Sequence, residues 1–210
     1  MDRDLIIEIN KMKKGEAGRL VAQKTQEFKN LSYKGNKKWF SELSFCILTA
    51  NSTAKLGLRI QRELGSQGFL KLPYGELSHR LKMVGHRFPN TRARFIVEAR
   101  RFHNIKDIIM KFEDAREARE WLVKNVKGIG WKEASHFLRN VGFGGVAILD
   151  RHVLRTMYKY KLVDAVPKTL TRERYLRLEE KLVGVAQELG LPLGELDLYL
   201  WFMEAGKILK

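Results

Sequence analysis

Apolar residues recur at helical spacing along almost the whole chain, whereas the alternation typical of β-strands is nearly absent. Successive sets mark one face of a helix each, for example Trp39, Phe40, Leu43 and Ile47, then Leu56, Ile60 and Leu64, then Trp121, Leu122 and Val126. Gly and Pro separate these sets, as in Gly65-Ser66-Gln67-Gly68 and Phe88-Pro89-Asn90. The sequence therefore predicts an all-α protein without an internal repeat.

The charge balance points to a polyanion as the partner. Forty Lys and Arg face 24 Asp and Glu, which gives a formal net charge of +16. An anionic membrane surface would attract the same charge, but there is no long apolar span, secretory segment or lipidation motif. We therefore expect an intracellular protein with nucleic acid, and no membrane, as its partner.

One short motif predicts a phosphate-binding turn. Lys127-Gly128-Ile129-Gly130 lies between two helical patterns, and the second of these runs from Trp131 to Val141. A Gly-x-Gly turn lets the backbone approach a phosphate closely, with amide N–H groups and a helix N-terminus directed at the anion. This segment is typical of a clamp on the DNA backbone.

Lys132 and Asp150 turn this clamp into a candidate active site. Lys132 starts the helix after the turn, where the positive end of the helix dipole and nearby cations favour an uncharged, nucleophilic amine. Asp150 is placed as the N-cap of a helix that begins at Arg151. Taken alone, Lys132 is interpreted as a solvated lysine that contacts phosphate, and Asp150 is interpreted as a helix N-cap without a catalytic role. Together behind the Gly-Ile-Gly turn, they suit chemistry at a deoxyribose C1′.

The residues 128–134, with Lys132, and Asp150 resemble the helix-hairpin-helix DNA glycosylase superfamily, in its bifunctional branch. The single cysteine, Cys46, excludes the four-cysteine iron–sulfur cluster of the endonuclease III-like branch. Segments 45–54, 86–95 and 206–210 are similar to the archaeal-type 8-oxoguanine DNA glycosylase/AP lyase family. This resemblance covers nearly the whole chain.

The resemblance implies two helical lobes with the active-site cleft between them. The middle lobe would span residues 33–133 and end in the hairpin, and the second would combine 1–32 with 134–210. Lys132 would form a Schiff base with the sugar, Asp150 would stabilise the charge developing there, and β-elimination would cut the strand. No cofactor is expected, although the resemblance implies a monovalent cation at the carbonyls of Lys124, Val126 and Ile129.

Several residues are candidate DNA contacts. Asn51, at the start of an expected helix from Ser52 to Leu64, either fills the gap left by an extruded base or is a plain N-cap or turn residue. Phe88 is either a wedge between bases or a core anchor under its loop. Arg87 and Arg92 are expected to read the orphaned cytosine or hold phosphates.

Recognition of the damaged base is assigned by the resemblance to the C-terminal Lys210, whose carboxylate would accept a hydrogen bond from N7–H of 8-oxoguanine. The alternative for Lys210 is a basic tail. Trp201 is a candidate stacking surface, whereas Tyr199 and Phe202 are expected in the core. The two histidines His136 and His152 are expected to touch phosphate or fill an interface rather than bind metal.

Two alternatives to this function stay open on the sequence. One is a glycosylase of the same superfamily that acts on another damaged base, and the other is a DNA-binding hairpin protein without catalysis. The expected setting is the cytoplasm of a prokaryotic cell, in association with the nucleoid, and the expected state is a monomer on double-stranded DNA.

Overall fold

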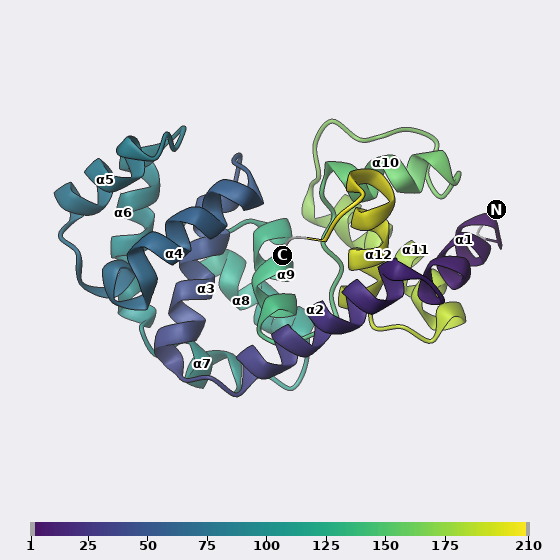
Figure 1. The fold of residues 1–210 in the computed structure, drawn as a ribbon, viewed down its shortest axis with the longest axis horizontal. Helices are drawn as coiled ribbons and strands as arrows, with labels where there is room; N and C mark the ends of the chain where they lie inside the picture. The colour runs from purple at the N-terminus through teal and green to yellow at the C-terminus, as the bar shows by residue number, and fades with distance from the viewer. Residues whose placement is uncertain (1–2, 209–210) are drawn as a thin grey trace.

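The computed structural model describes residues 3–208, and this range contains helices and turns with no strand (Figure 1). The helices are α1 (Arg3–Lys13), α2 (Glu16–Ser32), α3 (Asn36–Thr49), α4 (Ala54–Lys71), α5 (Tyr74–Met83), α6 (Pro89–Ala99), η1 (Arg100–Phe102), α7 (Ile105–Ile109), α8 (Ala115–Asn125), α9 (Trp131–Asn140), α10 (Arg151–Lys159), α11 (Arg172–Leu189) and α12 (Leu193–Ala205). The all-α prediction is confirmed. None of these described helices has the length and apolar character needed to cross a membrane.

Buried apolar side chains form two separate clusters, and each cluster is the core of one lobe. The first cluster draws its residues from Trp39 to Val146, in helices α3 to α9 and the segment after them. The second combines the N-terminal helices α1 and α2 with the segment that begins at Ala147 and with helices α10 to α12. Figure 1 shows the two lobes side by side, with α2 running from one to the other. Both chain ends therefore contribute to the second lobe.

Packing places the lobe boundary further along the chain than we expected. The family resemblance places residues 134–210 in the second lobe, but Ala134, Phe137 and Leu138 of α9 are buried in the first cluster. The Phe137 ring packs edge-on against Trp39 of α3, with 6.1 Å between the ring centroids. Because the apolar face of α9 is used in the first lobe, the chain crosses between lobes in the segment 146–150.

Helix α4 differs from the expected Ser52 to Leu64 at both ends. It begins at Ala54, because the Thr53 hydroxyl caps it and accepts the Leu56 N–H at 3.2 Å. Gly65, with φ +58°, bends the helix instead of ending it, and the helix continues to Lys71. Asn51 is therefore not an N-cap: it is exposed in the turn before the helix, with its own backbone at φ +57°.

Candidate active site at the lobe junction

The predicted hairpin joins α8 to α9 through residues 126–130. Gly128 has φ +84°, and a Cβ at this position would lie 2.4 Å from Cδ2 of Phe95 in α6. Ile129 is buried beneath the turn and anchors it to the first lobe. Gly130 precedes α9 without a side-chain cap, so the first N–H groups of that helix are available to an anion.

Lys127 extends outward from the turn. Its side chain is 66% exposed, and its Nζ lies 3.0 Å from Oε2 of Glu98 in α6. An ion pair this exposed contributes little stability, so Lys127 can exchange the carboxylate for a phosphate at small cost. Its contact with DNA stays a prediction.

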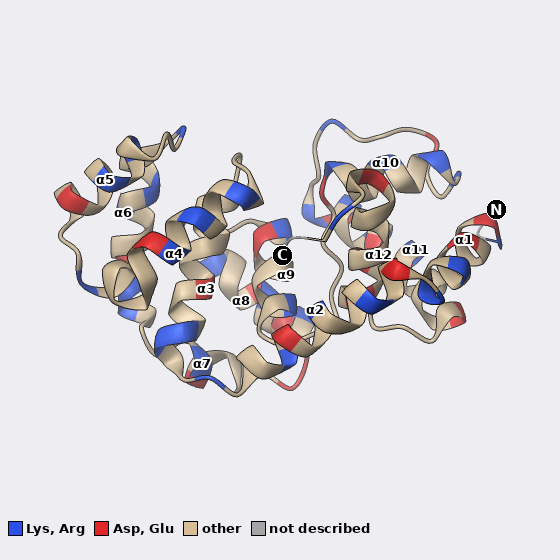
Figure 2. Cartoon of the chain, in the orientation of Figure 1, with Lys and Arg blue, Asp and Glu red and all other residues tan. Residues whose placement is uncertain are grey.

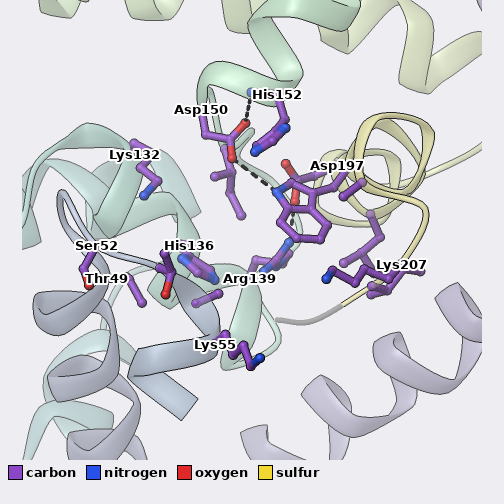
Figure 3. A pocket seen from close by; sticks show the side chains of 17 residues that line it. Thr49, Ser52, Lys55, Lys132, His136, Arg139, Asp150, His152, Asp197 and Lys207 are labelled. Atoms are coloured by element: carbon purple, nitrogen blue, oxygen red, sulfur yellow. Dashed lines mark hydrogen bonds and ion pairs between the residues drawn. The ribbon is translucent and has the colours of Figure 1, made fainter. Parts of the chain in front are cut away.

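A pocket of about 520 Å³ opens beside the hairpin, where the two lobes meet. Its wall comes from both lobes: the turn between α3 and α4, one face of α9, the start of α10, and α12 with the residues after it. Lys132 from α9 and Asp150 from the start of α10 both line this cavity (Figure 3). The fold thus brings together the two residues that the sequence analysis paired.

Asp150 is fixed in direction by three hydrogen bonds. Its Oδ1 accepts the backbone N–H groups of His152 at 2.8 Å and Val153 at 2.9 Å, which confirms the predicted N-cap of α10. Its Oδ2 accepts Nε1–H of Trp201 at 3.3 Å. The carboxylate is therefore held at the pocket wall, where it can stabilise a positive charge.

Lys132 is the least exposed of the lysines among the described pocket residues. Its side chain is 29% exposed, whereas Lys55 and Lys207 are exposed residues. Its Nζ lies 3.3 Å from Oε1 of Glu133, so its nearest charged neighbour is a carboxylate. Partial burial restricts the number of conformations of the Lys132 amine and separates it from the solvated lysines nearby.

A buried ion pair that was not predicted from the sequence lines the pocket. Nη1 of Arg139 in α9 donates to Oδ2 of Asp197 in α12, and both side chains are 5% exposed. Burial raises the pKa of Asp197 to about 7, against the opposing effect of Arg139. The missed signal was helical spacing: Lys132, His136 and Arg139 follow an i, i+4, i+7 pattern, and Asp197 lies one turn before Trp201.

Asn51 lies in the turn before α4, and Arg87 and Phe88 lie in the turn before α6; these two turns of the first lobe are neighbours. His86 joins them, since its Nε2 lies 2.9 Å from the Leu48 carbonyl while its Nδ1 accepts the Phe88 N–H at 3.1 Å. Phe88 is 36% exposed, with the Arg87 guanidinium 5.1 Å from its ring centroid. Phe88 is thus presented at the surface rather than anchored in the core, as a wedge requires.

Arg92 is placed differently from our expectation. It is buried, and its Nη2 donates to the Ala50 carbonyl at 2.6 Å. This contact ties α6 to the turn that carries Asn51. Arg92 therefore supports the position of that turn, and Arg87 is the exposed arginine of the pair.

The remaining aromatic candidates separate by burial. Tyr199 is buried in the second cluster as expected, whereas Phe202 is only partly buried. Trp201 is partly buried, lines the pocket and meets the His152 ring edge-on at 5.5 Å between centroids.

Lys210 lies outside the described residues, although Lys207 and Ile208 bring the end of the described chain to the pocket wall. His136 also lines the pocket, beside Phe45.

The carbonyls proposed for a monovalent cation lie where a helix ends. Lys124 is in the last turn of α8 and Val126 is its C-cap, so carbonyls there lack full in-helix pairing. The Val126 carbonyl accepts the Ile129 N–H at 3.2 Å and keeps a second lone pair. These donors suit a weakly bound cation, which stays a prediction. Over residues 3–208, no group of three or more His, Cys, Asp or Glu forms a candidate metal site.

Comparisons with known proteins agree with this geometry. Residues 21–191 match the sequence model of a family described as 8-oxoguanine DNA glycosylase. The chain is 54% identical over 206 residues to the 8-oxoguanine DNA glycosylase/AP lyase of Methanocaldococcus jannaschii, which covers 98% of this chain and 99% of the relative. It is 47% identical to the protein of the same name from Thermotoga maritima, with 98% of each chain covered.

Solved structures give the same result. The Methanocaldococcus jannaschii 8-oxoguanine glycosylase/lyase in complex with a 15mer DNA containing 8-oxoguanine has a TM-score of 0.95, 53% identity, and coverage of 98% of this chain and 99% of that one. A non-covalent endonuclease III–DNA complex has a TM-score of 0.63 at 15% identity, with 96% of this chain and 85% of that one covered. At that identity the second likeness shows the shared fold alone.

Proposed function

Because this chain belongs to the 8-oxoguanine DNA glycosylase family, we propose that it excises 8-oxoguanine from duplex DNA and then cleaves the strand through a Schiff base on Lys132. One observation carries the assignment of residues. Lys132 and Asp150 reach a single pocket between the lobes, next to the hairpin 126–130, where the start of α9 has no side-chain cap. The pocket is large enough, at about 520 Å³, for an extruded nucleotide.

The chemistry follows from these positions. The Lys132 amine, once deprotonated, forms a bond to C1′ while the C1′–N9 bond breaks and its electron pair leaves with the base. Asp150 faces the positive charge that develops on the sugar. Ring opening gives an iminium, the C2′ proton becomes acidic, and its removal expels the 3′ phosphate by β-elimination. The enzyme is regenerated when water releases Lys132.

The surface around the pocket supports binding of a bent duplex. The hairpin N–H groups and Lys127 hold the backbone beside the lesion, while Phe88 and Asn51 occupy the space left by the extruded nucleotide. Blue Lys and Arg segments are spread over both lobes in Figure 2, in keeping with a net charge of +16. We further propose that the chain acts on nucleoid DNA. We also propose that it is a monomer, which light scattering of the purified protein tests.

Borohydride trapping tests the central assignment. Lys132→Gln should keep its affinity for a lesion duplex and lose both base release and the trapped protein–DNA adduct. Lys55→Gln is the matched control, because Lys55 also lines the pocket but is exposed. It should retain the adduct. An adduct that persists in Lys132→Gln, or disappears in Lys55→Gln alone, would assign the amine elsewhere.

A substrate panel tests the lesion. Duplexes with 8-oxoguanine, uracil, thymine glycol or an alkylated purine should be cleaved with a clear preference for the first. We also propose that Lys210 takes part in recognition of the damaged base and that Trp201 stacks on it. Deleting Lys210 should reduce the ratio of 8-oxoguanine to guanine excision. An unchanged ratio would remove Lys210 from base recognition.

A further inference from the structure

A second buried ion pair lies between the lobes, away from the pocket. Nη1 and Nη2 of Arg119 in α8 donate to the two carboxylate oxygens of Glu179 in α11, at 2.5 and 2.8 Å. Both side chains are almost completely buried. Two parallel hydrogen bonds of this kind fix direction as well as distance, so α11 of one lobe is held in one orientation on α8 of the other.

The same carboxylate and a neighbouring tyrosine hold the segment that crosses between the lobes. Oε1 of Glu179 accepts the Ala147 N–H at 2.7 Å. One turn earlier in α11, the Tyr175 hydroxyl donates to the Ala147 carbonyl at 2.7 Å and accepts the Leu149 N–H at 3.2 Å. Burial raises the pKa of Tyr175 above its ordinary value, so the phenol stays protonated and able to donate. Asp150 is the next residue after Leu149.

The cluster also contacts the residue before Lys132. The Arg119 guanidinium lies 4.8 Å from the ring centroid of Trp131, and the Tyr175 ring centroid lies 5.8 Å from it. Trp131 is the first residue of α9 and directly precedes Lys132. One compact cluster therefore touches the chain immediately before each of the two residues that carry the proposed chemistry.

We propose that Arg119, Tyr175 and Glu179 are positioning residues that set the placement of Asp150 relative to Lys132 across the lobe junction. This inference rests on the proposed roles of Lys132 and Asp150. The two residues come from different lobes and meet at the pocket, and the segment 146–149 that leads to Asp150 has no helical structure of its own. Hydrogen bonds from α11 hold that segment, and the Arg119–Glu179 ion pair connects α11 to the lobe that carries Lys132.

The test is Tyr175→Phe, which removes the hydroxyl contacts with Ala147 and Leu149, together with a 3.2 Å contact to Ser135 Oγ in α9, and keeps the ring beside Trp131. With enzyme in excess over a duplex containing 8-oxoguanine, the single-turnover rate constant for base release should fall by about tenfold, since small misplacements of reacting groups are costly. The affinity for a duplex with a stable abasic analogue and the reaction amplitude should not change. Tyr199→Phe is the matched control: it removes a buried phenol from the same lobe and leaves segment 147–149 untouched, so its rate constant should equal that of the wild type.

The pattern of results separates the explanations. A cluster that only stabilises the fold predicts a lower free energy of unfolding, measured in urea, with an unchanged rate constant at saturating enzyme, and that result overturns the proposal. A second pair extends the test: Glu179→Gln keeps an acceptor for the Ala147 N–H and should lose less of the rate constant than Glu179→Ala. Equal rate constants in that pair also count against positioning. If the wild type forms the Lys132 adduct while Tyr175→Phe reacts at the normal rate, only the positioning inference fails, whereas an adduct in Lys132→Gln removes the proposed function itself.

Discussion

Three glycine-to-alanine substitutions measure what the hairpin requires of its backbone. Gly184 is an exposed helical position in α11, and a methyl group added at its Cα would meet nothing within 4 Å. Gly85 has φ +80° and equally open space. Gly128 has φ +84°, and its added Cβ would lie 2.4 Å from the Phe95 ring. Going from Gly184 to Gly85 therefore adds the cost of a positive φ, and going from Gly85 to Gly128 adds the steric overlap with Phe95.

The expected free energies of unfolding follow from these differences. Gly184→Ala should stabilise the protein by roughly 0.5–1 kcal/mol, because alanine is the better helix former. Gly85→Ala should destabilise it by roughly 1–2 kcal/mol, the cost of a Cβ in the left-handed region. Gly128→Ala carries the same backbone cost and an overlap with Phe95 of roughly 1–3 kcal/mol, which gives about 2–5 kcal/mol in total.

Urea unfolding at equilibrium measures all three values, with a constant slope m as the check on two-state behaviour. Binding to an undamaged duplex is measured in parallel and should weaken for Gly128→Ala, which distorts the hairpin, and stay unchanged for Gly184→Ala, which lies on α11 away from the proposed DNA contacts. If Gly128→Ala and Gly85→Ala differ by less than about 0.5 kcal/mol, the Phe95 ring moves aside without cost. The claim that close packing against α6 fixes the hairpin would then be wrong.

Three further predictions concern single residues. The pKa of Asp197 is raised to about 7 from 3.8, so the folded protein holds that proton more tightly than the unfolded chain, and this carboxyl should lower stability as pH rises between those values. Asp197→Asn should flatten this fall in melting temperature, and an identical pH dependence in both proteins would contradict the assignment. Thr53→Ala should reduce the free energy of unfolding by about 1 kcal/mol through loss of the α4 cap, and an unchanged urea midpoint would show that this cap contributes nothing. Trp201→Phe should slow base release, because Asp150 Oδ2 loses its hydrogen bond, and a wild-type rate constant would show that the other two bonds suffice.

Features set by neighbouring residues were predictable from the sequence. Helical periodicity gave the fold class, and the Gly-Ile-Gly turn gave the break between α8 and α9. The cap at Asp150 was also predictable, because the bonds run to backbone groups two and three residues away. Even so, the local signal misplaced the start of α4, where Asn51, Ser52 and Thr53 are all capping residues and only one is used.

The sequence by itself determined most of the helices and the glycine turn that separates α8 from α9, since these depend on contacts within a few positions. Only the tertiary structure decided what surrounds the reacting groups. Arg139 meets Asp197 across 58 positions, Arg119 meets Glu179 across 60, and Arg92 turns inward to the Ala50 carbonyl 42 positions away. A buried arginine and an exposed one look the same in the sequence, because burial depends on how distant helices pack against each other.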